Sequence, residues 1–527
     1  MGWVESPPYL TALTETACDL ANQQLRTHDP QLRQLHRLEA VASTPPTDCD
    51  VLHRVITPLR APTGDTTTRQ KNPVASVDVY VDDSLLLAQT KRQQQRVMRA
   101  ALHSIDDDVF RPLQTNDPAH RKEPASTKKM LKGDACWMDH KRILGWDIDS
   151  RAMTLNLPPH RLERLREVLS WLCPPRTRLA VSKWHRLLGE LRSMSPALPG
   201  TRGLFSVLQE ALRHSDRQRV RLTQHVYDTA ADFTALVDSL ASRPTRLPEL
   251  VPTSPSHVGA CDACQVGMGG IWLTADSTAA SPPTLWRQRF DPHVSRALIT
   301  ADNRRGSISI SDLELTGIIA HKDVAATAFD VRERTVWIAS DNRAAVSWST
   351  KGSASSMAAR AYLLRLNALH QRHHRYLARH HYIPGPVNAM ADDASRRWDL
   401  SDSALLTHLN TRYPQAQSWK LHPLPPATNS ALTGALCRKR PPDGFLGNIT
   451  SLPTPVGASG PLSAQARSWT PTTWAPATPS PCSSCLHNDI APDRSLPAVN
   501  RCDLGQWRMP YERWVRRTPG WGPRTLA

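Results

Sequence analysis

Four carboxylates at the ends of predicted elements constrain this chain more than any other feature. In the segment 257–397, Asp262 and Asp341 each close an apolar run, so both are expected directly after strands. Glu314 lies early in a helical pattern, and Asp392 opens a helix that follows a strand and a turn. A sheet with covering helices would bring all four side chains to one edge.

Carboxylates gathered in this way repel one another and are costly to hold together without a cation. Hard cations such as Mg²⁺ or Mn²⁺ take oxygen ligands. Two such ions about 4 Å apart can hold an attacking water and a leaving oxygen for in-line phosphodiester cleavage. A single aspartate after a strand is more often a turn residue, so it is the ordered set of four that predicts a metal site.

The same segment resembles a type I ribonuclease H domain of an LTR-retrotransposon polyprotein. The matching pieces are D-A-C-Q-V-G-M-G-G, S-D-L-E-L-T-G, A-S-D-N and H-Y-I-P-G-P-V-N-A-M-A-D-D-A-S-R, of which the last is the most specific. The resemblance implies that Asp262, Glu314, Asp341 and Asp392 are the metal ligands, with Mg²⁺ or Mn²⁺ as cofactor.

The resemblance also assigns three supporting residues. His381 would be the mobile histidine that assists product release or proton movement, although nearby histidines make a solvated basic cluster the alternative. Asn342 and Asn388 would contact the hybrid backbone or position ligands, with helix capping as the alternative. Asp393 competes with Asp392, which is preferred because it aligns with the Ala-Asp of the motif.

A second motif, Y-V-D-D at 80–83, lies at the tip of a predicted hairpin with alternating valines before it and Leu85 after it. It resembles the Y-x-D-D motif of reverse transcriptase palms, in which Tyr80, Asp82 and Asp83 would form the polymerase motif and both aspartates would bind metal. G-W-V-E-S-P-P-Y, from residue 2, resembles the template-contacting segment, and R-I-L-G-W-D-I-D, from residue 142, resembles the primer grip. An acidic β-turn is the ordinary alternative for the motif alone.

This resemblance has one departure. A palm needs a third carboxylate on a strand that precedes the segment at Gly2, and the fingers precede it as well. Two acids on one turn cannot build a two-metal site alone. We therefore expect RNA-directed DNA polymerase activity to be lost in this chain, unless the start codon is mis-called and the chain is a fragment of a full polymerase.

Residues 158–240 show helical periodicity with many arginines on the polar faces. In a thumb-like region, Arg161, Lys183 and Arg186 would contact duplex phosphates without sequence choice, while a solvated surface is the alternative for each of them. The formal charge of +17 favours a polyanionic partner.

The expected fold class is α/β and α+β, in several domains. Residues 1–150 would form a partial palm, 151–250 a helical thumb or connection, and 255–400 a ribonuclease H-like mixed sheet. Residues 401–527 would be a mostly disordered tail rich in Pro, Ser and Thr. No apolar run is long enough to span a membrane and the start lacks a signal-peptide pattern, so an intracellular location, cytoplasmic or nuclear, is expected.

The function expected from these features is Mg²⁺-dependent endonucleolytic hydrolysis of RNA in RNA–DNA hybrids. The alternatives are a catalytically inactive nucleic-acid-binding relic and a recruitment protein built on the Pro-rich tail. The hybrid is the expected partner, and the oligomeric state is left open.

Overall fold

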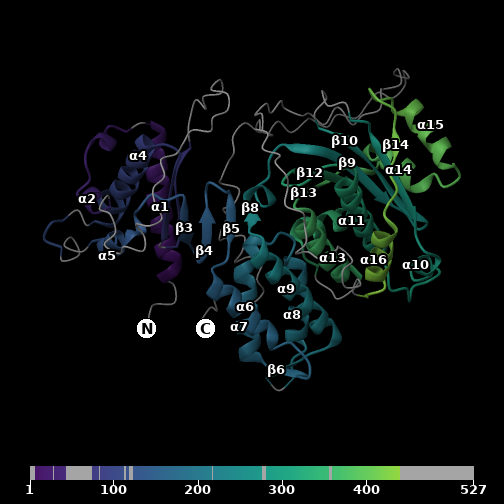
Figure 1. The fold of residues 1–527 in the computed structure, drawn as a ribbon, viewed down its shortest axis with the longest axis horizontal. Coiled ribbons are helices and arrows are strands. Elements are labelled where there is room, and N and C mark those ends of the chain that lie inside the picture. Colours follow the sequence, from purple (N-terminus) through teal and green to yellow (C-terminus); the bar gives the residue numbers. More distant parts are fainter. Residues whose placement is uncertain are drawn as a thin grey trace, which may run out of the picture. The chain divides into compact units, whose positions relative to one another are not determined.

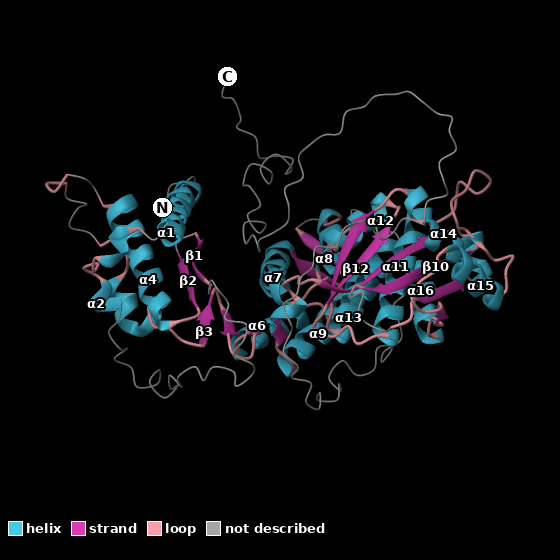
Figure 2. Cartoon of the chain, turned by 90° about the horizontal axis from the view of Figure 1, so that it is seen from above, coloured by secondary structure: helices cyan, strands magenta, loops and turns pink. Residues whose placement is uncertain are grey.

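The computed structural model combines helices with several sheets (Figures 1 and 2). It describes residues 6–27, 29–42, 74–81, 83–111, 114–117, 123–216, 218–275, 281–354 and 359–439. Asp82, the segment 2–5 and the tail beyond 439 lie outside these residues. Within them, no helix is long and apolar enough to cross a membrane.

A two-stranded antiparallel hairpin lies at the centre of the N-terminal region. β1 and β2 pair with Tyr80 opposite Asp83, which confirms the predicted hairpin. Helices α1 and α4 pack on it through Ala21 and Val97, which are fully buried. The elements of this region are α1 (Ser6–Thr27), η1 (Pro30–Arg33), α2 (Glu39–Ala42), β1 (Ala75–Tyr80), β2 (Asp83–Ala88), α4 (Lys91–Leu102), η2 (His103–Phe110), α5 (Thr127–Lys129) and η4 (Met130–Asp134).

A second sheet has the strand order β3-β4-β5-β8. Its strands are β3 (His140–Ile143), β4 (Trp146–Asp149), β5 (Thr154–Asn156) and β8 (Thr245–Arg246). Leu144 and Gly145 join β3 to β4, and both have positive φ, at 51° and 77°. Two consecutive positive φ values are typical of the tight hairpin turns that match strand twist.

A helical bundle follows, with η5 (Ser195–Ala197) and the short ribbon β6 (Arg178–Ala180) and β7 (Arg219–Arg221). Its helices are α6 (Pro159–Ser170), α7 (Val181–Met194), α8 (Arg202–Arg213) and α9 (Gln224–Ser242). Apolar residues of α6 and α7, such as Leu165 and Trp184, are buried in one core, as the helical periodicity over 158–240 predicts.

A six-stranded mixed sheet carries the segment with the four carboxylates. Its order is β13-β12-β9-β10-β11-β14, with β9 parallel to β12 and antiparallel to β10. Helices α11, α13 and α16 contribute to the core on one face, and α14 and α15 to the core on the other. The elements are η6 (Leu247–Glu249), β9 (Pro255–Ala263), β10 (Gly267–Thr274), β11 (Thr284–Arg289), α10 (Pro292–Arg296), α11 (Ile310–Ala328), β12 (Thr335–Ser340), α12 (Arg343–Lys351), α13 (Ala359–His374), β13 (Leu377–Tyr382), η7 (Gly385–Val387), α14 (Ala389–Arg396), α15 (Asp402–Arg412), β14 (Lys420–Leu421) and α16 (Pro426–Leu436).

The structure has regular elements well beyond residue 400, so the expectation of a mostly disordered tail over residues 401–527 is wrong for residues up to 439. β14 pairs with β11 as the sixth strand, and Leu432 and Leu436 of α16 are 1% and 2% exposed in the main core. Thr428 of α16 also donates a hydrogen bond to the buried Asp323 of α11. The apolar side chains of α16 are therefore needed to close the sheet's core.

Helix α13 joins the bundle to the sheet. Arg365 on α13 donates to Asp232 on α9 over 2.7 Å, and both residues are 1–2% exposed. Arg372, one per cent exposed, donates to Thr245 Oγ1 over 2.7 Å and to Ser239 Oγ over 3.0 Å. Removing either partner of a buried ion pair is strongly destabilising, so these contacts tie the two cores into one cooperative unit.

Candidate metal centre and nucleic-acid interface

Two of the predicted carboxylates lie at the ends of adjacent parallel strands. β9 and β12 pair in register through Ala260 and Ala339, so Asp262 and Asp341 each stand two residues further along neighbouring strands. Because side chains two residues apart point to the same face of a strand, these two carboxylates are brought together by the register alone. Asp262 is 1% exposed, and Asp341 is partly exposed.

Glu314 reaches the same edge from helix α11. A capping box starts this helix: the Ser309 hydroxyl accepts from the Asp312 amide, and the Asp312 carboxylate accepts from the Ser309 amide. This cap fixes where the helix begins and places Glu314 within its first turns, facing the end of β9. One oxygen each of Asp262, Glu314 and Asp341 lies within 4.8 Å of the others.

Oxygens in this group are left without partners although they are buried. Asp262 Oδ1 and Glu314 Oε2 accept no hydrogen bond from any described residue. Burial raises the pKa of Glu314 well above its usual value, and repulsion from Asp262 and Asp341 raises it further. Burial followed by repulsion from Asp262 also raises the pKa of Asp341. The three acids are held close without enough positive charge to stabilise them.

Asp392 lies beside this group rather than within it. Helix α14 crosses β10 closely: a Cβ on Gly269 would stand 2.7 Å from the Ala394 backbone. This approach places Ser395 Oγ at 2.5 Å from Asp262 Oδ2, to which it donates. Burial, and then repulsion from Asp262, raises the pKa of Asp392 to about 6.

The neighbouring Asp393 faces the other way. Its carboxylate accepts from Tyr413 Oη over 3.0 Å and lies 3.1 Å from His408 Nε2, both belonging to or following α15. Asp393 therefore anchors α15, while Asp392 is the acid that stands next to Asp262.

The supporting residues predicted around the acids are placed as follows. Asn342 Oδ1 accepts from the Ala345 amide over 3.0 Å, so this side chain caps α12. Asn388 is 1% exposed and donates to the Cys261 carbonyl over 3.2 Å, and its hydrogen bond to Asp341 lowers the pKa of that acid. His381 is exposed on β13, where it lies opposite Ala339 of β12. Its ring centroid is 4.9 Å from that of Trp337.

The hairpin that carries the polymerase motif has no comparable cluster. Tyr80 is 61% exposed, and Asp83 is exposed and belongs to none of the groups of three metal-ligating side chains found among the described residues. Asp82 lies outside those residues. Thr14 of α1 donates to the Val81 carbonyl over 2.6 Å and holds the turn against that helix.

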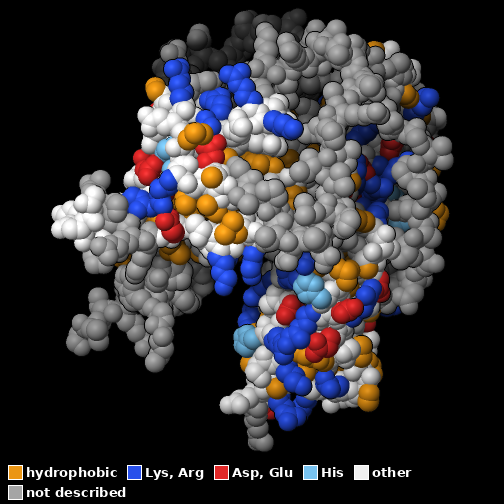
Figure 3. Space-filling view, turned by 60° about the vertical axis from the view of Figure 1, so that its left-hand side comes forward, with side chains coloured by type: hydrophobic (Ala, Val, Ile, Leu, Met, Phe, Trp, Pro, Cys, Tyr) orange, Lys and Arg blue, Asp and Glu red, His pale blue; other side chains and the backbone are white. Residues whose placement is uncertain are grey.

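Basic side chains gather on the bundle, where Figure 3 shows many lysines and arginines on the lower part of the view, the part that holds α6–α9 in Figure 1. Lys183 and Arg186 are exposed and lie over the Trp171 ring, at 5.5 Å and 5.8 Å from its centroid. Arg161 differs, because it is half-buried and donates to the Gly145 carbonyl and to Ser193. It braces the turn between β3 and β4.

Sequence reasoning missed two further basic residues, Arg219 and Arg221, which lie near Arg178. In the ribbon β6–β7, Leu179 and Val220 point into the core, and Arg178 stands directly opposite Arg221 on the outer face. Arg219 shares that face, and no ion pair to a described carboxylate satisfies any of these three arginines. Like charges opposite each other destabilise a ribbon, so this face is suited to an anionic ligand.

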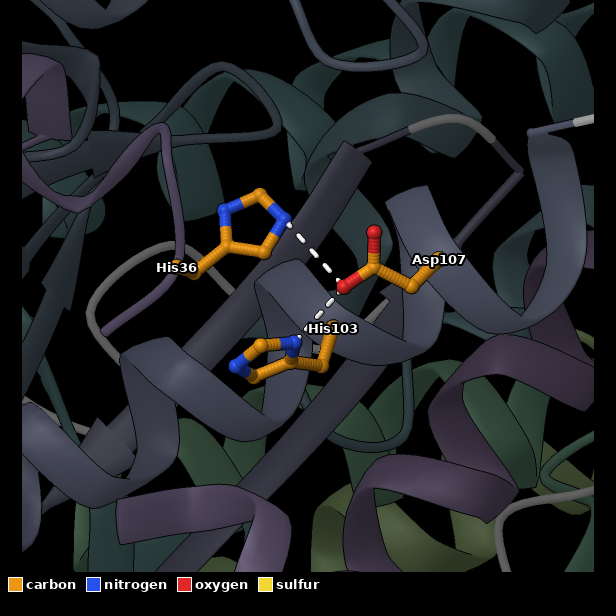
Figure 4. Close-up of side chains that lie close together, drawn as sticks. All are labelled: His36, His103 and Asp107. Atoms are coloured by element: carbon orange, nitrogen blue, oxygen red, sulfur yellow. Dashed lines mark hydrogen bonds and ion pairs between the residues drawn. The ribbon is translucent and has the colours of Figure 1, made fainter. Parts of the chain in front are cut away.

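Two other groups combine histidine with carboxylate. In Figure 4, His36 and His103 approach Asp107, at 3.7 Å and 2.7 Å. His36 Nδ1 accepts from the Leu38 amide over 3.1 Å, so the ring proton is on Nε2, the atom that faces Asp107. A metal-binding histidine instead donates through its other nitrogen. His103 Nδ1 is hydrogen-bonded to Asp107 at 2.7 Å, so we interpret this group as a structural contact between the histidines and the acid.

The second of these groups consists of Asp323, His370 and His374. Both ring nitrogens of His370 are engaged, with Tyr376 Oη and Asp323 Oδ1, each at 3.0 Å. This group also connects helices within the core and leaves no ring nitrogen of His370 for a metal.

The acid group at the ends of β9 and β12 suits a hard divalent cation. Its donors are all carboxylate oxygens, the ligand type that Mg²⁺ and Mn²⁺ select. Asp262 and Glu314, two members of the group, each have a buried oxygen without a hydrogen-bond partner among the described residues. The donor set and the missing positive charge therefore both fit such an ion.

No protein-family model and no curated protein matches the sequence. Among solved structures, the chain is similar to the foamy viral protease-reverse transcriptase in complex with RNA/DNA hybrid, at 10% identity and a TM-score of 0.27 over 59% of this chain and 36% of that one. A complex of the same viral protein with dsDNA gives 10% identity and a TM-score of 0.26, over 59% and 55%. A third, the dRH form with ds DNA, gives 9% and 0.26, over 58% and 46%.

The chain thus spans between 36% and 55% of the length of these solved chains. TM-scores of 0.26 and 0.27 are too low to carry an argument about fold or activity.

Proposed function

We propose that this chain is a metal-dependent nuclease that hydrolyses the RNA strand of RNA–DNA hybrids. The observation that carries the proposal is the convergence of Asp262, Glu314 and Asp341 from three separate elements, with buried oxygens left unpaired. A protein that used these acids only for folding would pair them with arginine or amide donors, because unpaired buried charge is costly. Mg²⁺ or Mn²⁺, when bound, would supply charge neutralisation and an activated water for in-line attack.

Each residue has a part in this proposal. Asp262, Glu314 and Asp341 would hold one cation, and Asp262 with Asp392 would hold a second one. Ser395 donates to Asp262 Oδ2 and would thereby orient that carboxylate, whose Oδ1 has no hydrogen-bond partner among the described residues. Asn388 positions Asp341 in the same way. His381, exposed on β13, would take part in proton movement or product release after the substrate has bound.

The nucleic acid would be held by the exposed cations of the bundle. Lys183 and Arg186 lie over Trp171, and the ribbon arginines have no carboxylate partner among the described residues. Such a surface contacts phosphates without reading sequence. In this proposal residues 1–150 are a partial reverse transcriptase palm, 151–250 a thumb-like region and 255–436 the nuclease, from an LTR-type retrotransposon.

The test is cleavage of a hybrid, labelled on its RNA strand, by the full chain in Mg²⁺. The matched variants are Asp262→Asn and Asp302→Asn, the second removing an exposed carboxylate that does not belong to the acid group. We expect cleavage by the wild type and by Asp302→Asn, and none by Asp262→Asn. The same reactions on double-stranded DNA and on single-stranded RNA would establish the hybrid preference.

Absence of cleavage by a folded wild-type chain that still binds the hybrid would overturn the proposed nuclease. It would favour instead a nucleic-acid-binding protein that has lost its chemistry. Cleavage that persists in Asp262→Asn would show that the activity belongs to another site or to a contaminant.

A further inference from the structure

Arg396 lies over the acid group from the solvent side. It is the last residue of α14, one helical turn after Asp392. Its Nε stands 3.4 Å from Asp262 Oδ2, and its Nη2 stands 3.1 Å from Asp392 Oδ1. The Arg396 side chain is 55% exposed, whereas Asp262 is 1% exposed. One guanidinium therefore bridges a buried acid and a half-exposed one at the mouth of the site.

This arginine divides the acid group into two unequal parts. Glu314 and Asp341 have no ion pair with any described cation, although one oxygen of each lies within 4.8 Å of the other and of an Asp262 oxygen. The space between Asp262 and Asp392 is instead held by the Arg396 guanidinium. The two places where a cation could bind thus differ in whether a positive charge of the chain itself is already present.

The two ion pairs of Arg396 with Asp262 and Asp392 can be broken. The Arg396 side chain is half-exposed, and its pair with the partly exposed Asp392 is a surface ion pair, which holds weakly. This long arginine can therefore rotate away without disturbing the core. A divalent ion attracts two carboxylates more strongly than a single positive charge does. Once released, the planar guanidinium matches the two oxygens of a phosphate.

We propose that Arg396 is a built-in counter-ion that competes with a divalent cation for the space between Asp262 and Asp392, and that moves to a phosphate of the substrate when that cation binds. This inference rests on the proposed nuclease and makes the second cation site conditional. The Asp262–Glu314–Asp341 site fills first, and the site at Asp392 fills readily only when nucleic acid provides another partner for Arg396. In the absence of substrate, Arg396 would thereby keep the two cation sites from being occupied at the same time.

The neighbouring Arg397 provides a matched control. It also lies at the end of α14 and carries the same charge, but it pairs with Asp399 at 3.1 Å and contacts none of the four acids. Arg396→Gln and Arg397→Gln therefore remove the same charge one residue apart, only one of them from the mouth of the site. Arg396→Lys keeps the charge and removes the planar fork.

The experiment is calorimetric titration of Mn²⁺ into the full chain without nucleic acid. In Arg396→Gln we expect the weaker binding event to tighten about fivefold or more, with Arg397→Gln matching the wild type and Arg396→Lys in between. With Ca²⁺ in place of Mn²⁺, binding of a hybrid should weaken in Arg396→Gln and not in Arg397→Gln.

An unchanged or weakened Mn²⁺ titration in Arg396→Gln would overturn the competition, as would an equal change in Arg397→Gln. The titration needs no turnover, so it separates this inference from the proposed function. A wild type that binds Mn²⁺ but cleaves nothing would contradict the nuclease alone. A wild type and variants that bind no Mn²⁺ would contradict both.

Discussion

Asp106 in the N-terminal region and Asp262 in the six-stranded sheet are equally buried, at 1% exposure, but differ in what neutralises them. Asp106 accepts from Arg37 Nη2 over 2.5 Å and from Arg111 Nε over 2.9 Å, so two guanidinium groups surround it. Asp262 accepts from Ser395 over 2.5 Å and from one exposed guanidinium at 3.4 Å. Its second oxygen has no partner among the described residues.

At Asp106 the chain neutralises a buried carboxylate that serves only to stabilise the fold. In the N-terminal region it uses arginines that come from separate loops and tie them together. In the sheet it places two more acids beside the first and leaves their repulsion in place. Retained repulsion of this kind is characteristic of functional sites, because the missing charge is what a bound cation supplies.

The largest expected effect follows from removing the acid that touches every part of the site. Asp262→Asn should lower hybrid cleavage about 1,000-fold, because metal stabilisation of the transition state is worth several kcal/mol and each 1.36 kcal/mol is a factor of ten. Its unfolding free energy without metal should stay the same or rise, because one repelling charge is gone. Single-turnover cleavage rates and urea denaturation measure the two effects, and a large loss of stability would mean that Asp262 is structural.

The opposite pattern is expected for the neutralised aspartate. Asp106→Asn leaves Arg37 and Arg111 facing a neutral amide, and breaking a buried pair in this way costs about 3 kcal/mol. Cleavage by the folded fraction should be unchanged. Urea denaturation of the N-terminal region measures the expected loss of stability, and the cleavage rate of the folded fraction measures whether activity is unchanged. If Asp106→Asn slows cleavage as much as Asp262→Asn does, the two aspartates do not differ in role.

A smaller effect concerns stability and pH. Burial and repulsion raise the pKa of Asp392 to about 6 and the pKa of Glu314 and Asp341 above their usual values. An unfolded chain releases these protons near pH 4, whereas the folded chain keeps them until higher pH. The folded state therefore binds more protons, and its stability falls as pH rises from about 4 through 6.

Thermal melts in metal-free buffer should show this fall, and Mg²⁺ should reduce it. Burial also raises the pKa of Asp106, so part of the fall should remain when Mg²⁺ is present. Asp392→Asn should remove a portion of the Mg²⁺-sensitive part. A fall that Mg²⁺ leaves untouched would show that the acids of the sheet do not cause it.

Much of the candidate site could be predicted because its residues follow local patterns. Asp262 and Asp341 end apolar runs, and the apolar run fixes both the strand and the point where it stops. Their approach to each other could not be derived from such runs, since it depends on the parallel pairing of Ala260 with Ala339, about 80 residues apart. The residue pattern predicts that the acids share one edge of a sheet, and the resemblance to a nuclease domain assigns them to one metal site.

The errors have equally local causes. Helix α16 was missed because prolines precede it and because Ala431 and Ala435 give its apolar face a weak signal, although Leu432 is buried. The ribbon β6–β7 has three residues in each strand, too few for alternation to be recognised. The sequence therefore gives no signal that Arg219 and Arg221 share a face with Arg178, which follows from the antiparallel pairing of β6 with β7.

The smallest expected effect concerns arginines, which also differ in whether a carboxylate of the chain pairs with them. Arg221 has no carboxylate partner among the described residues, whereas Arg166 on the same bundle pairs with Asp238 at 3.0 Å. Arg221→Ser should weaken hybrid binding about two- to threefold and reduce the slope of log affinity against log salt by about one, as expected for one lost phosphate contact. Arg166→Ser should change neither. Equal losses in both variants would mean that an internal partner does not keep an arginine from the nucleic acid. Neutralisation within the chain would then distinguish structural from functional groups only among the acids.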